Sequence, residues 1–199
     1  MMRKVIILFI GFISLTTLAK AQSEAYQNNL TLGMGVTTLG VIKTAVEGAL
    51  LGESNISSVP NIEIAYDKGI TEWFSIGIIG AYQSLSISED YLGYENSFTL
   101  SRTVVAASFM FHYANKGKVD LYSGFRIGFK DWSYKATIGD VTATDNSGLE
   151  TLSVFSTGFS PQLTLFGLRG YLTDNIGIGM EVLSLGAPHI TSFNLNYRF

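Results

Sequence analysis

Seven charged residues could form a polar network, because each lies in or beside a segment of alternating residues and falls on its polar side. They are Glu63, Arg102, Asp120, Arg126, Lys130, Glu181 and Arg198. If these polar sides line a narrow lumen, the charges must pair, since an isolated buried charge is strongly unfavourable. The set therefore predicts a salt-bridge network that fills the lumen. The alternative is the lining of a narrow porin-like channel for ions or small solutes.

Two histidines, His112 and His189, are the only imidazoles, and the chain has no cysteine. A nucleophilic serine needs a nearby histidine whose ring is oriented by an acid. His189 has Ser184 and Ser192 near it in sequence but no evident acid, so we expect it at the surface or rim. A lipid A-modifying barrel enzyme is thus only a second alternative. We expect His112 in the lumen, and no catalytic, cofactor or metal site, hence no enzyme.

Eight segments show the period-two alternation that is typical of half-buried strands. In the most regular one, Val119–Phe129, Phe125, Ile127 and Phe129 alternate with Arg126 and Gly128. The eight segments are Leu30–Val36, Asn61–Tyr66, Phe74 to about Ser86, Thr103–Tyr113, Val119–Phe129, Phe155–Leu165, Ile176–Val182 and Phe193–Phe199.

The polar sides of these segments are mostly Gly, Ser, Thr and Asn, and only 15% of the residues are charged. A sheet that faced water would carry more Lys and Glu. The pattern therefore predicts an inverted arrangement in which apolar sides face lipid. In hydrocarbon every backbone amide must pair, so the sheet must close on itself. We expect an all-β, eight-stranded antiparallel up-and-down transmembrane β-barrel, whose interior is just wide enough for side chains.

The links between the segments alternate in length, as in outer-membrane barrels, which keep short turns on the periplasmic side. The long links are Thr37–Ser57, Ile87–Asn96 and Ser133–Leu152, and the short ones are Asp67–Glu72, Asn115–Gly117, Leu172–Asn175 and the exceptional outer link Leu185–Pro188. The first long link also has a helical spacing of apolar residues, which predicts a short amphipathic helix. We expect the long links outside the cell.

The N-terminus has the form of a secretory signal peptide, with Arg3 and Lys4 before the apolar run Val5–Leu18. Ala19 and Ala21 then supply small residues for cleavage, which predicts a signal peptide over 1–21 and a barrel domain over 22–199. Cleavage removes three of the 13 basic residues and none of the 16 acidic ones, so the net charge falls from −3 to −6. An acidic chain without a basic cluster excludes nucleic acid as a partner.

Three stretches resemble known outer-membrane proteins. The ending FNLNYRF places Phe193, Leu195, Tyr197 and Phe199 at every second position, and it resembles the C-terminal assembly signal of such barrels. GYLTDNIGIGMEVLSLGAP (Gly170–Pro188) and IEIAYDKGITEWFSIGIIGAY (Ile62–Tyr82) resemble the small outer membrane protein beta-barrel domain family, porin-like and of Bacteroidetes type.

The resemblance implies a Gram-negative outer-membrane location and contact with outer-membrane lipid, lipopolysaccharide and the barrel assembly machinery. It implies nothing specific about activity. We therefore expect a monomeric scaffold that presents its outer loops for surface interaction or envelope integrity.

Overall fold

The structure is a computed structural model that describes residues 27–37, 39–41, 43–44, 55–91, 94–116, 118–138, 141–144 and 157–199. The predicted signal peptide lies outside these residues. The strands are β1 (Asn28–Val36), β2 (Asn55–Thr71), β3 (Phe74–Tyr91), β4 (Tyr94–Lys116), β5 (Val119–Ile138), β6 (Val141–Ala143), β7 (Gly158–Tyr171), β8 (Ile176–Leu185) and β9 (Thr191–Arg198). In this part of the chain, no helix is long and apolar enough to cross a membrane.

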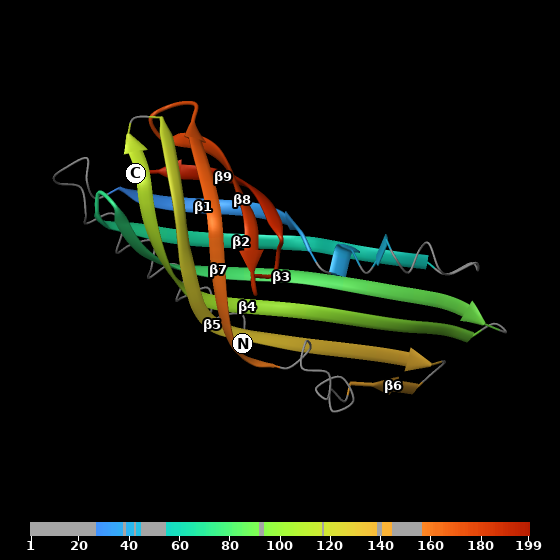
Figure 1. Cartoon of the computed structure of the whole chain (residues 1–199). Coiled ribbons are helices and arrows are strands. Elements are labelled where there is room, and N and C mark those ends of the chain that lie inside the picture. The colour runs from blue at the N-terminus through green and yellow to red at the C-terminus, as the bar shows by residue number, and fades with distance from the viewer. Residues whose placement is uncertain are drawn as a thin grey trace.

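Eight of these strands form a closed antiparallel ring in chain order (Figure 1). β1 pairs with β2 on one side and with β9 on the other, and β4 pairs with β5. Among the described residues, the short strand β6 pairs only with the far end of β5. The ring of eight antiparallel strands confirms the predicted barrel.

The strands of the ring differ greatly in length, and this gives the barrel two unlike ends. β2 to β5 run well past the level where β1, β7, β8 and β9 end, as Figure 1 shows. We call this projecting part, residues 55–60, 84–91, 94–102, 131–138 and 141–143, the extended sheet. In β3 it covers eight residues, which at about 3.3 Å per residue is about 26 Å.

The extended sheet corrects two expected loops. In place of the first, residues 87–91 and 94–96 are strand, and in place of the second, Ser133–Ile138 continues β5, because the alternation persists there although the outward side chains become polar. The expected short turn Asp67–Glu72 is also mostly strand, since β2 runs to Thr71. Pro60 lies at a β-bulge in β2, between the Val59 and Ile62 pairings, where proline interrupts no regular ladder bond.

The two faces of the long strands exchange character at the rim of the ring. On β3, Ile76, Ile78 and Tyr82 face outward from the barrel, whereas the outward positions of the extended sheet include the partly exposed Ser86 and Ser88. Within the ring the opposite, lumen-side face carries polar residues beside a buried apolar cluster of Ala65, Ile79, Ala81, Val104 and Ala106, and beyond the rim it becomes mainly apolar. Its apolar residues beyond the rim are Ile56, Leu85, Phe98, Leu100, Trp132 and Tyr134, which pack together with Leu39.

Part of the first long link is described. Residues 39–41 and 43–44 are helical, and the Gly40 amide donates to Thr37 Oγ1 over 2.9 Å, as an N-cap does. Leu39 is buried against the apolar lumen-side face. The rest of the predicted amphipathic helix lies outside the described residues.

Candidate functional site

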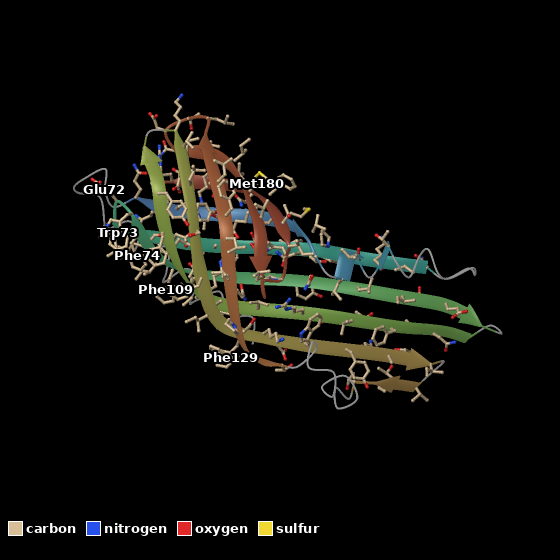
Figure 2. The ribbon with its side chains drawn as sticks, in the orientation of Figure 1. Glu72, Trp73, Phe74, Phe109, Phe129 and Met180 are labelled. Carbon is tan, nitrogen blue, oxygen red and sulfur yellow. The ribbon has the colours of Figure 1, made fainter. Side chains whose placement is uncertain are left out.

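The lumen is the candidate site, because the ring encloses polar side chains while its outside is apolar. Large apolar side chains cover the exterior, and Phe129 is 69% exposed there. Figure 2 shows Phe109 and Phe129 pointing away from the barrel. The lumen holds polar contacts at three levels, which are described below from the middle to the two ends.

Arg126 and Glu181 form a bidentate ion pair across the middle of the lumen. The Arg126 Nη2–Glu181 Oε1 distance is 2.7 Å and the Nη1–Oε2 distance is 3.0 Å. Tyr122 also donates its hydroxyl to Glu181 Oε1 over 3.0 Å. All three side chains are buried, and charge-assisted bidentate pairs are among the strongest hydrogen bonds in proteins.

His189 completes this middle level, which corrects the expected surface position. It is 1% exposed. Its Nδ1 lies 2.9 Å from Glu63 Oε2 and its Nε2 lies 3.3 Å from Glu181 Oε2. Carboxylates only accept hydrogen bonds, so both contacts are hydrogen bonds when the ring carries a proton on each nitrogen. His189 then links Glu63 on β2 to Glu181 on β8.

The short link after β8 carries His189 into the lumen. Gly186 adopts φ +73°, a left-handed conformation that favours glycine, and Pro188 is fully buried beyond it. Gly35 on β1 provides room for the His189 side chain, because a Cβ at Gly35 would lie 2.6 Å from His189 Cβ. The period-two pattern stops in this link, so alternation alone assigns His189 to no face.

At the short-turn end, Arg169 joins two carboxylates. Its Nη2 lies 2.9 Å from Asp67 Oδ2 and its Nη1 lies 3.5 Å from Asp120 Oδ2. Ser108 donates to Asp67 Oδ1 over 2.8 Å. His112 lies beside this group, with Nδ1 2.7 Å from Asp120 Oδ1. The predicted lumen position of His112 agrees with this placement.

At the opposite end, Arg102 lies under the extended sheet. Its guanidinium donates to the carbonyls of Gly186 and Ala187 and stacks over the Trp132 ring at 5.4 Å. It therefore fixes the β8–β9 link against β4 and β5. Lys130 is half-buried at this level, and it forms no ion pair with another described residue.

The other predicted charge, Arg198, lies at the rim of the short-turn end. Its Nε donates to the Asp174 carbonyl over 3.0 Å, and its guanidinium stacks over the Tyr171 ring at 3.9 Å. Of the seven predicted charges, Glu63, Asp120, Arg126 and Glu181 thus contact charged or histidine partners inside the ring. Arg102, Lys130 and Arg198 lie toward its ends.

The predicted C-terminal assembly signal lies on the outside of the ring. Phe193, Leu195 and Tyr197 are exposed and pair with Met34, Leu32 and Leu30 of β1. Phe199 follows the strand, and its ring stacks on Tyr197 at 5.7 Å. Together they form an apolar stripe along the strand that closes the barrel.

Two charged residues of the polar network, Asp67 and Arg169, were not among the seven predicted charges. Asp67 shares the period-two register of Glu63, so a longer β2 would have revealed it. Arg169 follows a bulge in β7, where Leu165 and Phe166 are both exposed and the alternation changes phase. A phase change of this kind in the alternation is the signal that could have placed Arg169 in the lumen.

The described lumen residues form neither a metal site nor a nucleophilic site in which His189 would activate Ser184 or Ser192. Among the described residues, no three His, Asp or Glu side chains are arranged to hold a metal ion. The hydroxyls of Ser184 and Ser192 are buried without a hydrogen-bond partner in the described part of the chain, whereas both nitrogens of His189 face carboxylates.

Comparisons with known proteins give weak similarities. No protein-family model matches the sequence, and no curated protein matches it. Two solved structures of Ail, the attachment invasion locus protein of Yersinia pestis, are similar. One is 12% identical over 89% of this chain and 100% of that chain, with a TM-score of 0.47. The other, in complex with the heparin analogue sucrose octasulfate, is 13% identical over 88% and 99%, with a TM-score of 0.49. Function is therefore inferred from the residues of this chain.

Proposed function

We propose that this chain is an outer-membrane β-barrel scaffold whose side-chain-filled lumen is closed and whose extended sheet and loops stand outside the cell. The observation that carries the proposal is the exchange of the two faces at the rim. An apolar exterior in the ring suits hydrocarbon, and a Ser- and Thr-rich exterior beyond it suits water.

The height of the apolar exterior supports the membrane part of the proposal. On β3 it extends from Phe74 to Tyr82, nine residues, or about 30 Å along the strand. With a strand tilt of about 40°, this corresponds to a band about 23 Å tall, close to the roughly 25 Å of outer-membrane barrels. The outward stripe Phe193, Leu195 and Tyr197 lies in the same band.

The lumen supports a scaffold better than a channel. An ion path needs continuous water, whereas Arg126, Glu181 and His189 occupy the middle of the ring with their polar groups directed at one another. An eight-stranded ring leaves room for side chains and little else. The extended sheet and its loops remain as the surface for partners, since binding residues concentrate on loops held by a rigid scaffold.

The scaffold proposal is tested by expression of the full chain in a Gram-negative host. We expect recovery in the outer-membrane fraction, heat-modifiable migration on gels and no steady conductance in planar bilayers. Deletion of Phe199 should reduce the folded, heat-modifiable fraction while the total amount of chain is unchanged. Folded, soluble protein in the periplasm would overturn the membrane location, and a stable conductance would favour the narrow channel.

A further inference from the structure

Three side chains at the short-turn end have the geometry of a nucleophilic serine site. Ser75 on β3 places its Oγ 2.9 Å from His112 Nε2. Asp120 on β5 places Oδ1 2.7 Å from His112 Nδ1. With its proton on Nδ1 toward Asp120, the His112 ring can accept the Ser75 hydroxyl proton at Nε2. That is the arrangement by which a histidine activates a serine.

The three side chains come from neighbouring strands and are held firmly. The His112 amide donates to the Trp73 carbonyl over 2.8 Å, which ties β4 to the β2–β3 turn. A β-bulge at Tyr113 follows directly in β4. Bulges often lie beside active sites, where they redirect a side chain. Ser75 and Asp120 are each the second residue of their strand, so the site lies near the barrel end.

A small cavity of about 30 Å³ adjoins the three groups. Gln27 and Gly69 in its wall are half-buried, so the cavity opens toward the end of the barrel. Two buried donors in the same wall, Thr71 Oγ1 and Arg169 Nε, have no hydrogen-bond partner among the described residues. A buried donor without a hydrogen-bond partner is energetically unfavourable, so both are suited to an oxygen of a bound molecule.

We propose that Ser75, His112 and Asp120 form a catalytic site that hydrolyses carboxylic esters with a small acyl group, of about the size of acetyl. The acyl size follows from the cavity, which holds only one or two water-sized groups. Ser75 and His112 are the catalytic residues, and Asp120 is a positioning residue that orients the ring. Thr71 and Arg169 supply donors for the negative charge that develops on the carbonyl oxygen.

The reaction has two balanced steps. Ser75 Oγ attacks the carbonyl carbon while its proton passes to His112 Nε2, and the alcohol leaves with that proton as the ester C–O bond breaks. A water molecule then attacks the acyl-serine and gives one proton to His112. The carboxylic acid leaves as that proton returns to Ser75 Oγ, so water is the only co-reactant.

The test uses the full mature barrel folded in detergent micelles, with heat-modifiable migration as the check of folding. p-Nitrophenyl acetate should transfer its acetyl group to Ser75 with loss of p-nitrophenol, and peptide mass spectrometry after an acid quench should place the acetyl adduct on Ser75. The folded protein should also hydrolyse p-nitrophenyl acetate. Ser75→Ala and His112→Gln should lower both rates by about 10²-fold or more, the usual contribution of nucleophile and general base.

A second buried serine in the lumen provides the matched control. Ser160 on β7 is buried toward the opposite end of the lumen and does not line the cavity, so Ser160→Ala should leave the labelling rate within about twofold. Asp120→Asn should lower labelling, and Asp120→Glu, which keeps a carboxylate, should restore part of it. A residue with only a structural role would not show that rescue.

Folded wild-type protein without an adduct on Ser75 would overturn the proposal, as would equal labelling of wild type and His112→Gln. If His112→Gln does not fold, two results still test the proposal. One is the position of the adduct in the wild type, and the other is the loss of labelling in Ser75→Ala, which removes a single oxygen atom. The scaffold proposal does not depend on either result.

Discussion

Arg126 and Glu181 illustrate how a charged lumen is stabilised in this barrel. The carboxylate of Glu181 receives two hydrogen bonds from Arg126 and one from Tyr122, and His189 contacts its Oε2 oxygen. A buried ion pair offsets the loss of hydration only when its geometry is good and the remaining polar atoms are satisfied. Removal of one partner leaves the other charge buried and unpaired, so it lowers the stability by more than the net energy of the pair would suggest.

Arg126→Ala should lower the free energy of unfolding by about 3–5 kcal/mol, because Glu181 loses its cationic partner while it stays buried. Urea unfolding in lipid vesicles measures this change. The double variant Arg126→Ala/Glu181→Ala should lose less than the sum of the two single variants. Lys68→Ala, at an exposed position, should change stability by less than about 0.5 kcal/mol. An unchanged midpoint for Arg126→Ala, together with conductance, would indicate a water-filled channel.

Gly167 tests how closely the lumen is packed. A Cβ at this position would overlap the Tyr122 ring, whose hydroxyl is held by Glu181. Gly167→Ala should therefore destabilise the barrel by about 1–3 kcal/mol, as overpacking does. On the same strand, a Cβ at Gly170 would have its nearest neighbour 3.9 Å away, so Gly170→Ala should be close to neutral. Equal unfolding midpoints for both variants would contradict the packed lumen.

The strands show how far sequence alone predicts this molecule. Alternation predicted the eight strands of the ring, because side chains in a strand point to opposite faces with a period of exactly two residues. The strand ends were predicted wrongly. The expected loop Ile87–Asn96 keeps the alternation, but its outward side chains become polar, so the strands were expected to end too early. The lumen position of Arg169 was missed because the alternation changes phase in β7. That of His189 was missed because it lies in the irregular link after β8.

The candidate site was harder to predict than the fold because its contacts cross the ring. Glu63 and His189 are 126 positions apart in sequence, and they meet because closure of the ring leaves only β1 between β2 and β9, the strand that follows His189. Sequence placed Asp120 and His112 in the lumen but not against each other. Their contact depends on the β4–β5 pairing and the bulge at Tyr113, and neither has a clear signature in composition.

The exchange of faces along β3 predicts a matched pair of substitutions on one strand. Ile78 and Ser88 both point outward, Ile78 from the ring and Ser88 from the extended sheet. Ile78→Arg should destabilise the barrel by about 2–4 kcal/mol in vesicles, since it places a charge in hydrocarbon. Ser88→Arg should change stability by less than about 0.5 kcal/mol. Equal losses at both positions would contradict a membrane boundary between them.

The complete ring also explains how a chain without cysteine can be stable without disulfides. Closure pairs the first strand with the last, and the amides of Asn28 and Phe199 each donate to the other residue's carbonyl. The backbone hydrogen bonds are thereby continuous around the barrel, and they supply the reinforcement that disulfides would otherwise have to provide. The two ends differ, with the extended sheet at one and tight turns such as Leu172–Asn175 at the other.

This asymmetry predicts the orientation of the barrel in the membrane, because outer-membrane barrels keep short turns in the periplasm. The absence of native cysteine makes single introduced cysteines specific labels. Lys135, exposed on the extended sheet, and Asp174, exposed in a short turn, mark the two ends. Lys135→Cys should react with an impermeant maleimide on intact cells, and Asp174→Cys should react only after the outer membrane is permeabilised. The unsubstituted protein should not react at all, and both variants should react equally in detergent. Labelling of Asp174→Cys but not Lys135→Cys on intact cells would reverse the topology and place the extended sheet in the periplasm.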